Sequence, residues 1–162
     1  MSSTLLYTFR TNRHLHEFKR AGLDIFVFGK LKEDVGTFQK IIEKNKPRLI
    51  ISVAEIRAQS RFETSAINAF GRNGKVNKAG KDSYALYTPA NIFPKSKRPT
   101  RSLCNWTMYE IGELAQVQSI NNSFIHSNAR DLPEVFHFLK NGSAVGGLDS
   151  PSGKTLKYPC GA

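Results

Sequence analysis

Apolar residues along the first third of the chain follow two different spacings. Continuous or nearly continuous apolar runs are typical of strands, and they occupy residues 4–9, 23–28 and 48–53. The third run, RLIISV, has the composition of a central strand that is covered on both faces. A short polar helix at residues 14–21 is predicted between the first two runs.

The second spacing, of three to four residues, is typical of one apolar face of a helix. It is carried by Val35, Phe38, Ile41 and Ile42, and it predicts a helix over 33–44 that Pro47 ends. Strand-like runs therefore alternate with helical segments. This order favours a mostly parallel sheet flanked by helices, which is the α/β fold class.

The periodicity fades from residue 71 to 100, where turn residues and cations dominate. We predict one strand in this region, at 83–87. Regular structure resumes with a helix over 102–116. Its core side is predicted to consist of Leu103, Trp106, Ile111 and Leu114.

The last predicted elements are a strand at 123–127 and a helix that ends near Leu139. Asp131 is predicted to cap this helix, with Pro133 in the first turn and Glu134 completing a capping box. Residues 1–142 then form one domain. Residues 143–162 are rich in Gly, Ser and Pro and are predicted to be a tail.

Composition narrows the class of protein further. A chain of 162 residues is long enough to bury a substantial core in one domain. The formal net charge of +11 attracts polyanions, so nucleic acid stays open as a partner. However, the cations are spread along the chain, with denser stretches only at 72–81 and 95–101, and no nucleic-acid-binding motif is present.

The cysteines and the apolar runs indicate the cellular compartment of the protein. Cys104 and Cys160 are far apart and lack the C-x-x-C spacing, which argues against a disulfide framework or a zinc site. No apolar run approaches the length that a membrane span needs. We therefore predict a cytoplasmic protein with neither a metal nor a membrane partner.

Cys104 is the first candidate for chemistry, because it falls in the first turn of a helix that Ser102 would cap. Unpaired backbone N–H groups and the helix dipole favour a thiolate there. The same N–H groups could hold an oxyanion. The alternative is that Cys104 is a small buried apolar residue.

His126 is the second candidate, because it ends an apolar strand, and sites in parallel sheets are built at the carboxyl ends of strands. A histidine there could deprotonate a neighbouring thiol, although a partly buried structural histidine is an equal alternative. A carboxylate could orient that imidazole. Glu63 and Glu55 are equally plausible for this task on composition alone.

Three short motifs now resemble one family. CNWTMY contains Cys104, FIHSNARDLPE contains His126, and ETSAIN begins with Glu63. In this order they resemble the C-N-x-x-x-Y, F-I-H…L-P-E and E-R-x-A-x-N motifs of pyroglutamyl peptidase I, a cysteine peptidase family that removes N-terminal pyroglutamyl residues from peptides. The resemblance covers about Asp24 to Leu139. It implies a Cys104–His126–Glu63 triad and a single-domain three-layer α/β/α sandwich.

The chain departs from the family at the pocket. The family's first loop carries G-F-E-P-F-G-G, whose phenylalanines sandwich the lactam ring, whereas this chain has YTFRTNRH. Phe9 can stand for the first phenylalanine, and Asn12 falls where the second would be. Thr64 replaces the usual Lys or Arg after the glutamate. A later arginine would fall on Asn73, with Arg72 one place off. The resemblance thus implies Phe9, Asn12 and Arg72 as substrate-binding residues.

The leading hypothesis is a thiol amidohydrolase that acts on peptides with a blocked N-terminus and needs no cofactor. One alternative is a catalytically weak or inactive relative that serves as a binding module. Another is a basic nucleic-acid-binding protein. The cations at 72–81 and 95–101 could form a basic rim that favours acidic peptides. By analogy with the family, a homo-oligomer also stays open.

Overall fold

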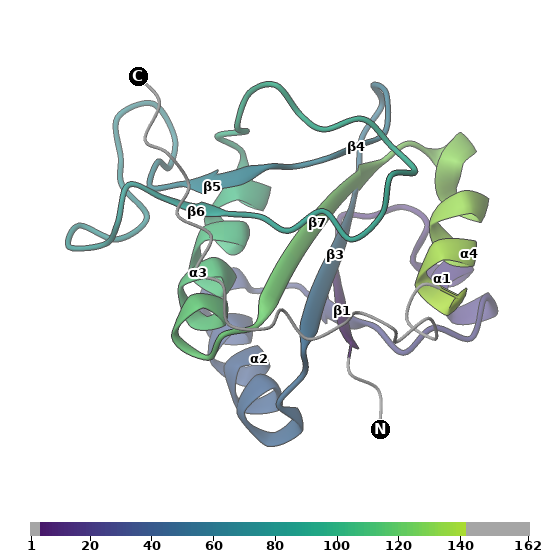
Figure 1. Ribbon diagram of the computed structural model, residues 1–162, viewed down its shortest axis with the longest axis horizontal. Coiled ribbons are helices and arrows are strands. Elements are labelled where there is room, and N and C mark those ends of the chain that lie inside the picture. Colours follow the sequence, from purple (N-terminus) through teal and green to yellow (C-terminus); the bar gives the residue numbers. More distant parts are fainter. Residues whose placement is uncertain (1–3, 142–162) are drawn as a thin grey trace.

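A five-stranded sheet forms the centre of the computed structural model, which describes residues 4–141 (Figure 1). Its strands lie in the order β2-β1-β3-β7-β4. Four strands are parallel, namely β1 (Thr4–Phe9), β2 (Phe26–Phe28), β3 (Leu49–Glu55) and β7 (Asn121–Ser127), and β4 (Arg61–Phe62) runs antiparallel to β7 at one edge. The predicted mostly parallel sheet is confirmed, with the 48–53 run at its centre.

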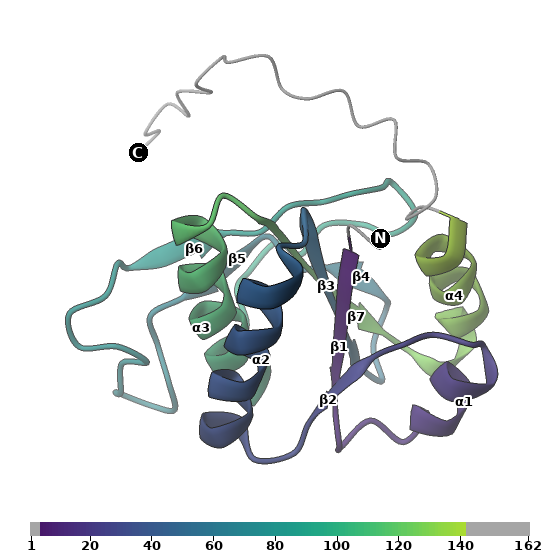
Figure 2. The ribbon, with the colours of Figure 1, turned by 90° about the horizontal axis from the view of Figure 1, so that it is seen from below.

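Helices cover both faces of this sheet. On one face lie α2 (Leu31–Asn45) and α3 (Leu103–Val117), and on the other lie α1 (Leu15–Arg20) and α4 (Leu132–Asn141), as Figure 2 shows. The buried apolar residues form two clusters, one on each face. Phe18 and Phe136, whose ring centroids are 4.9 Å apart, join the two helices of the second layer. The three-layer α/β/α architecture is therefore confirmed.

A smaller antiparallel pair, β5 (Ser65–Ile67) and β6 (Ser83–Ala85), packs against α3. We call residues 65–85 the arm. The buried Asn105 side chain accepts a hydrogen bond from the Ile67 N–H and donates two, to the carbonyls of Ile67 and Ala69. One helical turn later, the Tyr109 hydroxyl donates to the Lys81 carbonyl at 2.7 Å. Two residues of the CNWTMY motif thus anchor the arm.

Because the arm covers a second side of α3, this helix is buried more widely than a single apolar stripe predicts. Leu103, which was predicted to face the core, is 57% exposed, so that prediction is wrong. The buried positions of α3 are Asn105, Thr107, Met108, Tyr109, Ile111, Gly112 and Ala115.

Other predicted elements differ in their bounds. The strand predicted for 23–28 is confined to Phe26–Phe28, and β4 and β5 were not predicted. A 3-10 turn, Ala129–Asp131, precedes α4, and the Asn128 side chain caps that turn by accepting from the Asp131 N–H. The Asp131 carboxylate itself accepts a hydrogen bond from the Ser60 hydroxyl at 2.5 Å. The tail predicted for 143–162 lies outside the described residues.

Strand alternation decides which side chains reach the α2 and α3 face. Phe9 on β1, Ala54 on β3 and Phe124 on β7 all belong to the apolar cluster of that face. Because side chains alternate along a strand, His126 points the same way as Phe124. The carboxyl ends of β1, β3 and β7 therefore bring a shared set of side chains to one corner of the molecule.

Within residues 4–141, none of the helices combines the length and the apolar character that crossing a bilayer would require.

Candidate active site

A buried carboxylate and imidazole meet at the end of β7. The Nδ1 atom of His126 lies 2.6 Å from Oε1 of Glu63, and the two residues are 5% and 0% exposed. The backbone explains the contact. Arg61 on β4 pairs with His126, and Phe62 pairs with Ile125, so the next residue returns to the His126 face. The Glu63 N–H then donates to the Phe124 carbonyl at 2.9 Å.

Arg61 is a third member of this group, and no motif in the sequence singles it out. Its Nε donates to the same Oε1 atom of Glu63 at 2.9 Å. Burial alone would raise the pKa of Glu63, but the hydrogen bonds from His126 and Arg61 outweigh burial, and the pKa lies below its ordinary value. Glu63 is therefore a carboxylate at neutral pH. Its second oxygen, Oε2, is buried and has no partner among the described residues.

The contact with Glu63 fixes the chemistry of the imidazole. A carboxylate only accepts hydrogen bonds, so the Nδ1 atom of His126 carries the hydrogen. The neutral ring then presents an unprotonated Nε2. Phe124, with its ring centroid 5.0 Å from that of His126, packs against the ring. His126 is thus held in the tautomer that a general base needs.

Cys104 occupies the second position of α3, directly after Ser102 at the N-cap and Leu103. It is half-buried and packs against the same apolar cluster as Ala54 and Phe124. The first N–H groups of a helix have no intrahelical acceptor, and no side chain caps this end of α3, so the N–H groups of Leu103 and Cys104 stand at an open helix terminus. The prediction that Cys104 stands in the first helical turn is confirmed.

The expected lowering of the thiol pKa is not found. Burial raises the pKa of the Cys104 thiol above its ordinary value. The Ser102 hydroxyl opposes this effect, and the negative charge of Glu63 adds to it. Desolvation thus outweighs the hydrogen bonds to the sulfur. The resting group is a thiol, and a thiolate forms only when a base takes the proton.

No hydrogen bond joins the Cys104 thiol to His126 in the part of the chain that the structure describes. Both groups nonetheless belong to the same face of the sheet, at the carboxyl ends of the strands. Catalytic hydrogen bonds are often long in unliganded enzymes and tighten when substrate binds.

A cavity of about 310 Å³ opens beside Cys104. It lies at the ends of β1 and β3, and its lining consists of Phe9, Thr11, Asn12, Arg13, Ala54, Glu55, Ile56, Arg57 and Cys104. Phe9, which the family resemblance implied as an aromatic wall, is the one aromatic residue in this lining. The Asn12 amide donates to the Thr8 hydroxyl at 3.2 Å, and its oxygen accepts from the His14 N–H at 2.9 Å. Asn12 therefore also shapes the loop.

The two candidate carboxylates have different partners. Glu55 accepts hydrogen bonds from the guanidinium of Arg13, from Nε at 2.8 Å, and from the Arg13 N–H at 3.0 Å. The hydrogen bond from the Arg13 side chain, which outweighs the opposing effect of partial burial, lowers the pKa of Glu55. Of the two carboxylates, only Glu63 bonds to His126. Glu55 instead forms an ion pair at the mouth of the cavity.

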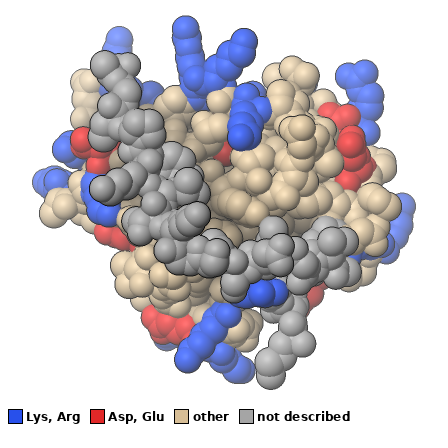
Figure 3. Space-filling view, viewed as in Figure 1, with Lys and Arg blue, Asp and Glu red and all other residues tan. Residues whose placement is uncertain are grey.

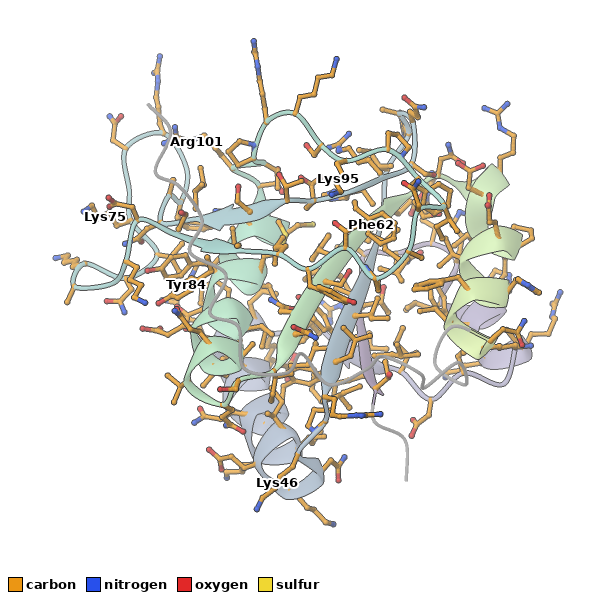
Figure 4. The ribbon with its side chains drawn as sticks, viewed as in Figure 1. Lys46, Phe62, Lys75, Tyr84, Lys95 and Arg101 are labelled. Carbon is orange, nitrogen blue, oxygen red and sulfur yellow. The ribbon has the colours of Figure 1, made fainter. Side chains whose placement is uncertain are left out.

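Arg72 is exposed in the arm and is not among the residues that line this cavity. Figure 4 shows Lys75 on the arm, well away from Lys95 beside β4, whereas Arg101, at the end of the second basic stretch, lies between them in this view. Lys75 and Lys95 therefore do not share one rim.

Among residues 4–141, no three His, Cys, Asp or Glu side chains gather in an arrangement that could hold a metal ion.

The sheet order and the helix layers define the class of this protein as a three-layer α/β/α domain with a mostly parallel sheet. Solved structures similar to it are peptidases. It resembles pyrrolidone carboxyl peptidase from Thermococcus litoralis, at 15% identity over 79% of this chain and 77% of that chain, with a TM-score of 0.66. It also resembles pyroglutamyl peptidase I from Bacillus amyloliquefaciens, at 17% identity over 86% and 94% of the two chains, with a TM-score of 0.67.

A mutant pyrrolidone carboxyl peptidase from Pyrococcus furiosus is similar as well, at 18% identity, with 77% of this chain and 80% of that chain covered and a TM-score of 0.61. No family model matches the chain, and no curated protein matches it in sequence. The chain thus has the fold of the pyroglutamyl peptidases. The resemblance inferred from three motifs is confirmed at the level of the fold.

Proposed function

We propose that this protein is a cysteine peptidase that removes an N-terminal pyroglutamyl residue from peptides. Cys104 would be the nucleophile, His126 the general base, and Glu63 the group that orients the imidazole. The observation that best supports this proposal is the buried Glu63–His126 contact of 2.6 Å, on the sheet face where α3 presents Cys104. The shared fold adds weight to it.

The proposed reaction begins with a proton transfer. Nε2 of His126 takes the proton of the Cys104 thiol, and the sulfur attacks the carbonyl carbon of the pyroglutamyl residue. The backbone N–H groups at the start of α3 hold the resulting oxyanion. His126 returns the proton to the leaving amine as the C–N bond breaks. Water, deprotonated by His126, then hydrolyses the thioester and releases pyroglutamate.

The raised pKa of Cys104 makes this coupling essential. A thiol that is neutral at rest becomes nucleophilic only as His126 accepts its proton. The carboxylate of Glu63 stabilises the imidazolium that forms.

We place the lactam ring in the cavity beside Cys104, against Phe9. With one aromatic wall in place of two, this site should bind a neutral lactam more weakly than a two-walled pocket does. Asn12 would position the loop that carries Phe9. Arg72 would contact the substrate only if the arm moved toward the site, so we assign it the smallest role in substrate binding.

The test is hydrolysis of L-pyroglutamyl-β-naphthylamide by the wild type and by Cys104→Ala. We expect Cys104→Ala to abolish release of the amine while circular dichroism and the melting temperature stay near the wild-type values. Cys160→Ala, which removes the other cysteine, is the matched control and should retain activity. Unchanged activity in Cys104→Ala would remove this residue from the mechanism.

A binding module without catalysis is the second candidate, and the raised pKa of Cys104 favours it. Titration of the single thiol of Cys160→Ala with iodoacetamide separates the two. Reaction that is fast at neutral pH and is slowed by Glu63→Gln supports a working triad. Reaction that appears only at alkaline pH, with the same profile in both proteins, supports the binding module.

A further inference from the structure

A second cavity, of about 570 Å³, lies on the other side of β7 from the first. We call it the basic groove. It is lined by Ala58, Gln59, Arg61, Pro94, Lys95, Ser96, Lys97, Arg98, Pro99 and Thr100. Four of these residues are cations and none is an acid. In Figure 3, Lys and Arg side chains project at the upper edge of the molecule, where Figure 1 shows the loop that leads into α3.

Backbone hydrogen bonds fix the position of the basic groove relative to Glu63. The Phe62 N–H donates to the Pro94 carbonyl at 2.9 Å, and the Ser96 N–H donates to the Phe62 carbonyl at 2.7 Å. The segment with Lys95 therefore runs along β4 as a short parallel bridge. Phe62 directly precedes Glu63, and Lys95 lies beside it in Figure 4.

The basic groove also shares a residue with the surroundings of Glu63. Arg61 lines it and at the same time donates to the Glu63 carboxylate. At its far end, the segment runs through Thr100 and Ser102 into the helix that carries Cys104. The basic groove therefore adjoins the proposed triad.

The order of the strands places the cavity beside Cys104, His126 and the basic groove in a row. The cavity with Phe9 lies at the ends of β1 and β3, His126 at the end of β7, and the basic groove along β4. These strands are neighbours in that order. A peptide whose first residue enters the cavity beside Cys104 and whose chain passes His126 would reach the basic groove with its following residues.

Most cations of the basic groove are free to attract an anionic ligand. Lys95, Lys97 and Arg98 are exposed and form no ion pair with any residue from 4 to 141. Their only charged neighbour in the groove is Arg61, whose partner is Glu63. Three uncompensated positive charges in a groove attract an anionic ligand and act more strongly at low ionic strength.

We propose that the basic groove binds acidic side chains that follow the N-terminal residue of the substrate. Preferred substrates are then peptides in which Asp or Glu occupies the positions just after pyroglutamate. This inference rests on the proposed function and adds a substrate class to it. A nucleic acid fits less well, because none of residues 72–81, the other basic stretch, lines the groove.

The experiment compares pyroglutamyl-Asp-Asp-Ala-amide with pyroglutamyl-Asn-Asn-Ala-amide. The ratio of their kcat/KM values is measured at low and at raised salt. The variant Lys97→Gln/Arg98→Gln removes two charges from the groove. Lys75→Gln/Lys78→Gln removes the same charge from the exposed arm and is the matched control.

Because each exposed charge pair contributes modestly and two acidic residues face the groove, we expect the wild type to prefer the acidic peptide by about tenfold at low salt. The preference should fall at least threefold in Lys97→Gln/Arg98→Gln, persist in Lys75→Gln/Lys78→Gln, and shrink as salt rises. Equal rates for the two peptides would overturn the inference while leaving the peptidase intact. Equal losses in both double variants would also overturn it, because net charge alone would then be responsible.

If the wild type cleaves neither peptide, the proposed function fails and the groove is tested by binding. Fluorescein-labelled Asp-Asp-Ala peptide is titrated with Cys104→Ala protein in the two charge backgrounds, and anisotropy is measured. Weaker binding only with Lys97→Gln/Arg98→Gln supports the groove. No binding, or tighter binding of a labelled single-stranded RNA that depends equally on both basic stretches, overturns it.

Discussion

Glu63→Gln tests the central contact of the site. The substitution keeps the shape of the side chain and removes its charge. In the wild type, Oε1 of Glu63 accepts hydrogen bonds from His126 at 2.6 Å and from Arg61 at 2.9 Å. A glutamine oxygen can still accept from Nδ1 of His126, so the orientation of the ring is largely kept. The main loss is the negative charge that stabilises the imidazolium.

The size of this loss follows from the geometry. At an effective dielectric constant of about 20, opposite charges about 4 Å apart attract by about 4 kcal/mol. The neutral hydrogen bond that remains retains about 1 kcal/mol. The barrier should therefore rise by about 3 kcal/mol, which corresponds to a rate loss of somewhat more than a hundredfold. Arg61, left beside His126 without its carboxylate, works in the same direction.

The assay is kcat/KM for L-pyroglutamyl-β-naphthylamide, with the melting temperature measured in parallel. Glu17→Gln is the matched control. Glu17 also contacts a histidine, with its Oε1 3.1 Å from Nδ1 of His14, but it lies outside the cavity. We expect Glu17→Gln to stay within about twofold of the wild type.

A Glu63→Gln protein that keeps its fold and at least half of the wild-type rate would refute the reasoning. It would mean that the Glu63–His126 contact is structural. A loss of rate matched by an equal loss in Glu17→Gln would point to a general effect of charge, again against a special role for Glu63.

Three further predictions concern stability. Asn105→Ala removes three buried hydrogen bonds to the arm, so urea denaturation should show a loss of about 3 kcal/mol, and a loss below about 1 kcal/mol would contradict the anchoring role. Arg61→Gln removes one of the donors that hold the pKa of Glu63 low. The stability that depends on ionised Glu63 is present above the ordinary glutamate pKa and is lost as pH falls through the lowered pKa of Glu63. The loss of folding stability on acidification should therefore start at higher pH in this variant than in the wild type. Gly80→Ala would force a Cβ atom onto the Tyr109 hydroxyl and should lower the melting temperature, whereas an unchanged value would show that Tyr109 can move without cost.

The long apolar patterns predicted the sheet well, because burial determines both the apolar pattern of a segment and its position in the sheet. The run at 4–9 is β1 residue for residue, and the run at 48–53 lies in the central strand β3 from Leu49 onward. The helix predicted for 33–44 is α2, extended by one or two residues at each end. These elements have enough residues for a period to be visible.

The short elements could not be predicted in this way. β4 has two residues and β5 three, which is too few to show alternation, and their positions depend on partners distant in sequence. The pairing of β4 with β7 nevertheless decides that Glu63 faces His126. A sequence pattern therefore located both residues, and only long-range pairing showed that they meet.

The motif around Cys104 shows how a chemical motif can also carry structure. Asn105 and Tyr109 lie one helical turn apart and bond to the arm, and neither bonds to His126 or Glu63 in the described part of the chain. Their hydrogen bonds hold α3 against the arm. Leu103 and Cys104 are left at the open end of the helix, where the first can be exposed and the second can face the cavity.

Glu63 has two opposing electrostatic effects at this site, and Arg61 moderates both. Its charge raises the pKa of the Cys104 thiol, which disfavours a free thiolate at rest, and in the proposed mechanism it stabilises the imidazolium that forms on His126 during the reaction. Arg61 neutralises part of that charge through Nε. In the proposed mechanism, one proton transfer from the Cys104 thiol to His126 creates both ions together. An exposed, permanently ionised thiolate would oxidise more readily, so a half-buried thiol with a raised pKa would protect the proposed nucleophile between turnovers.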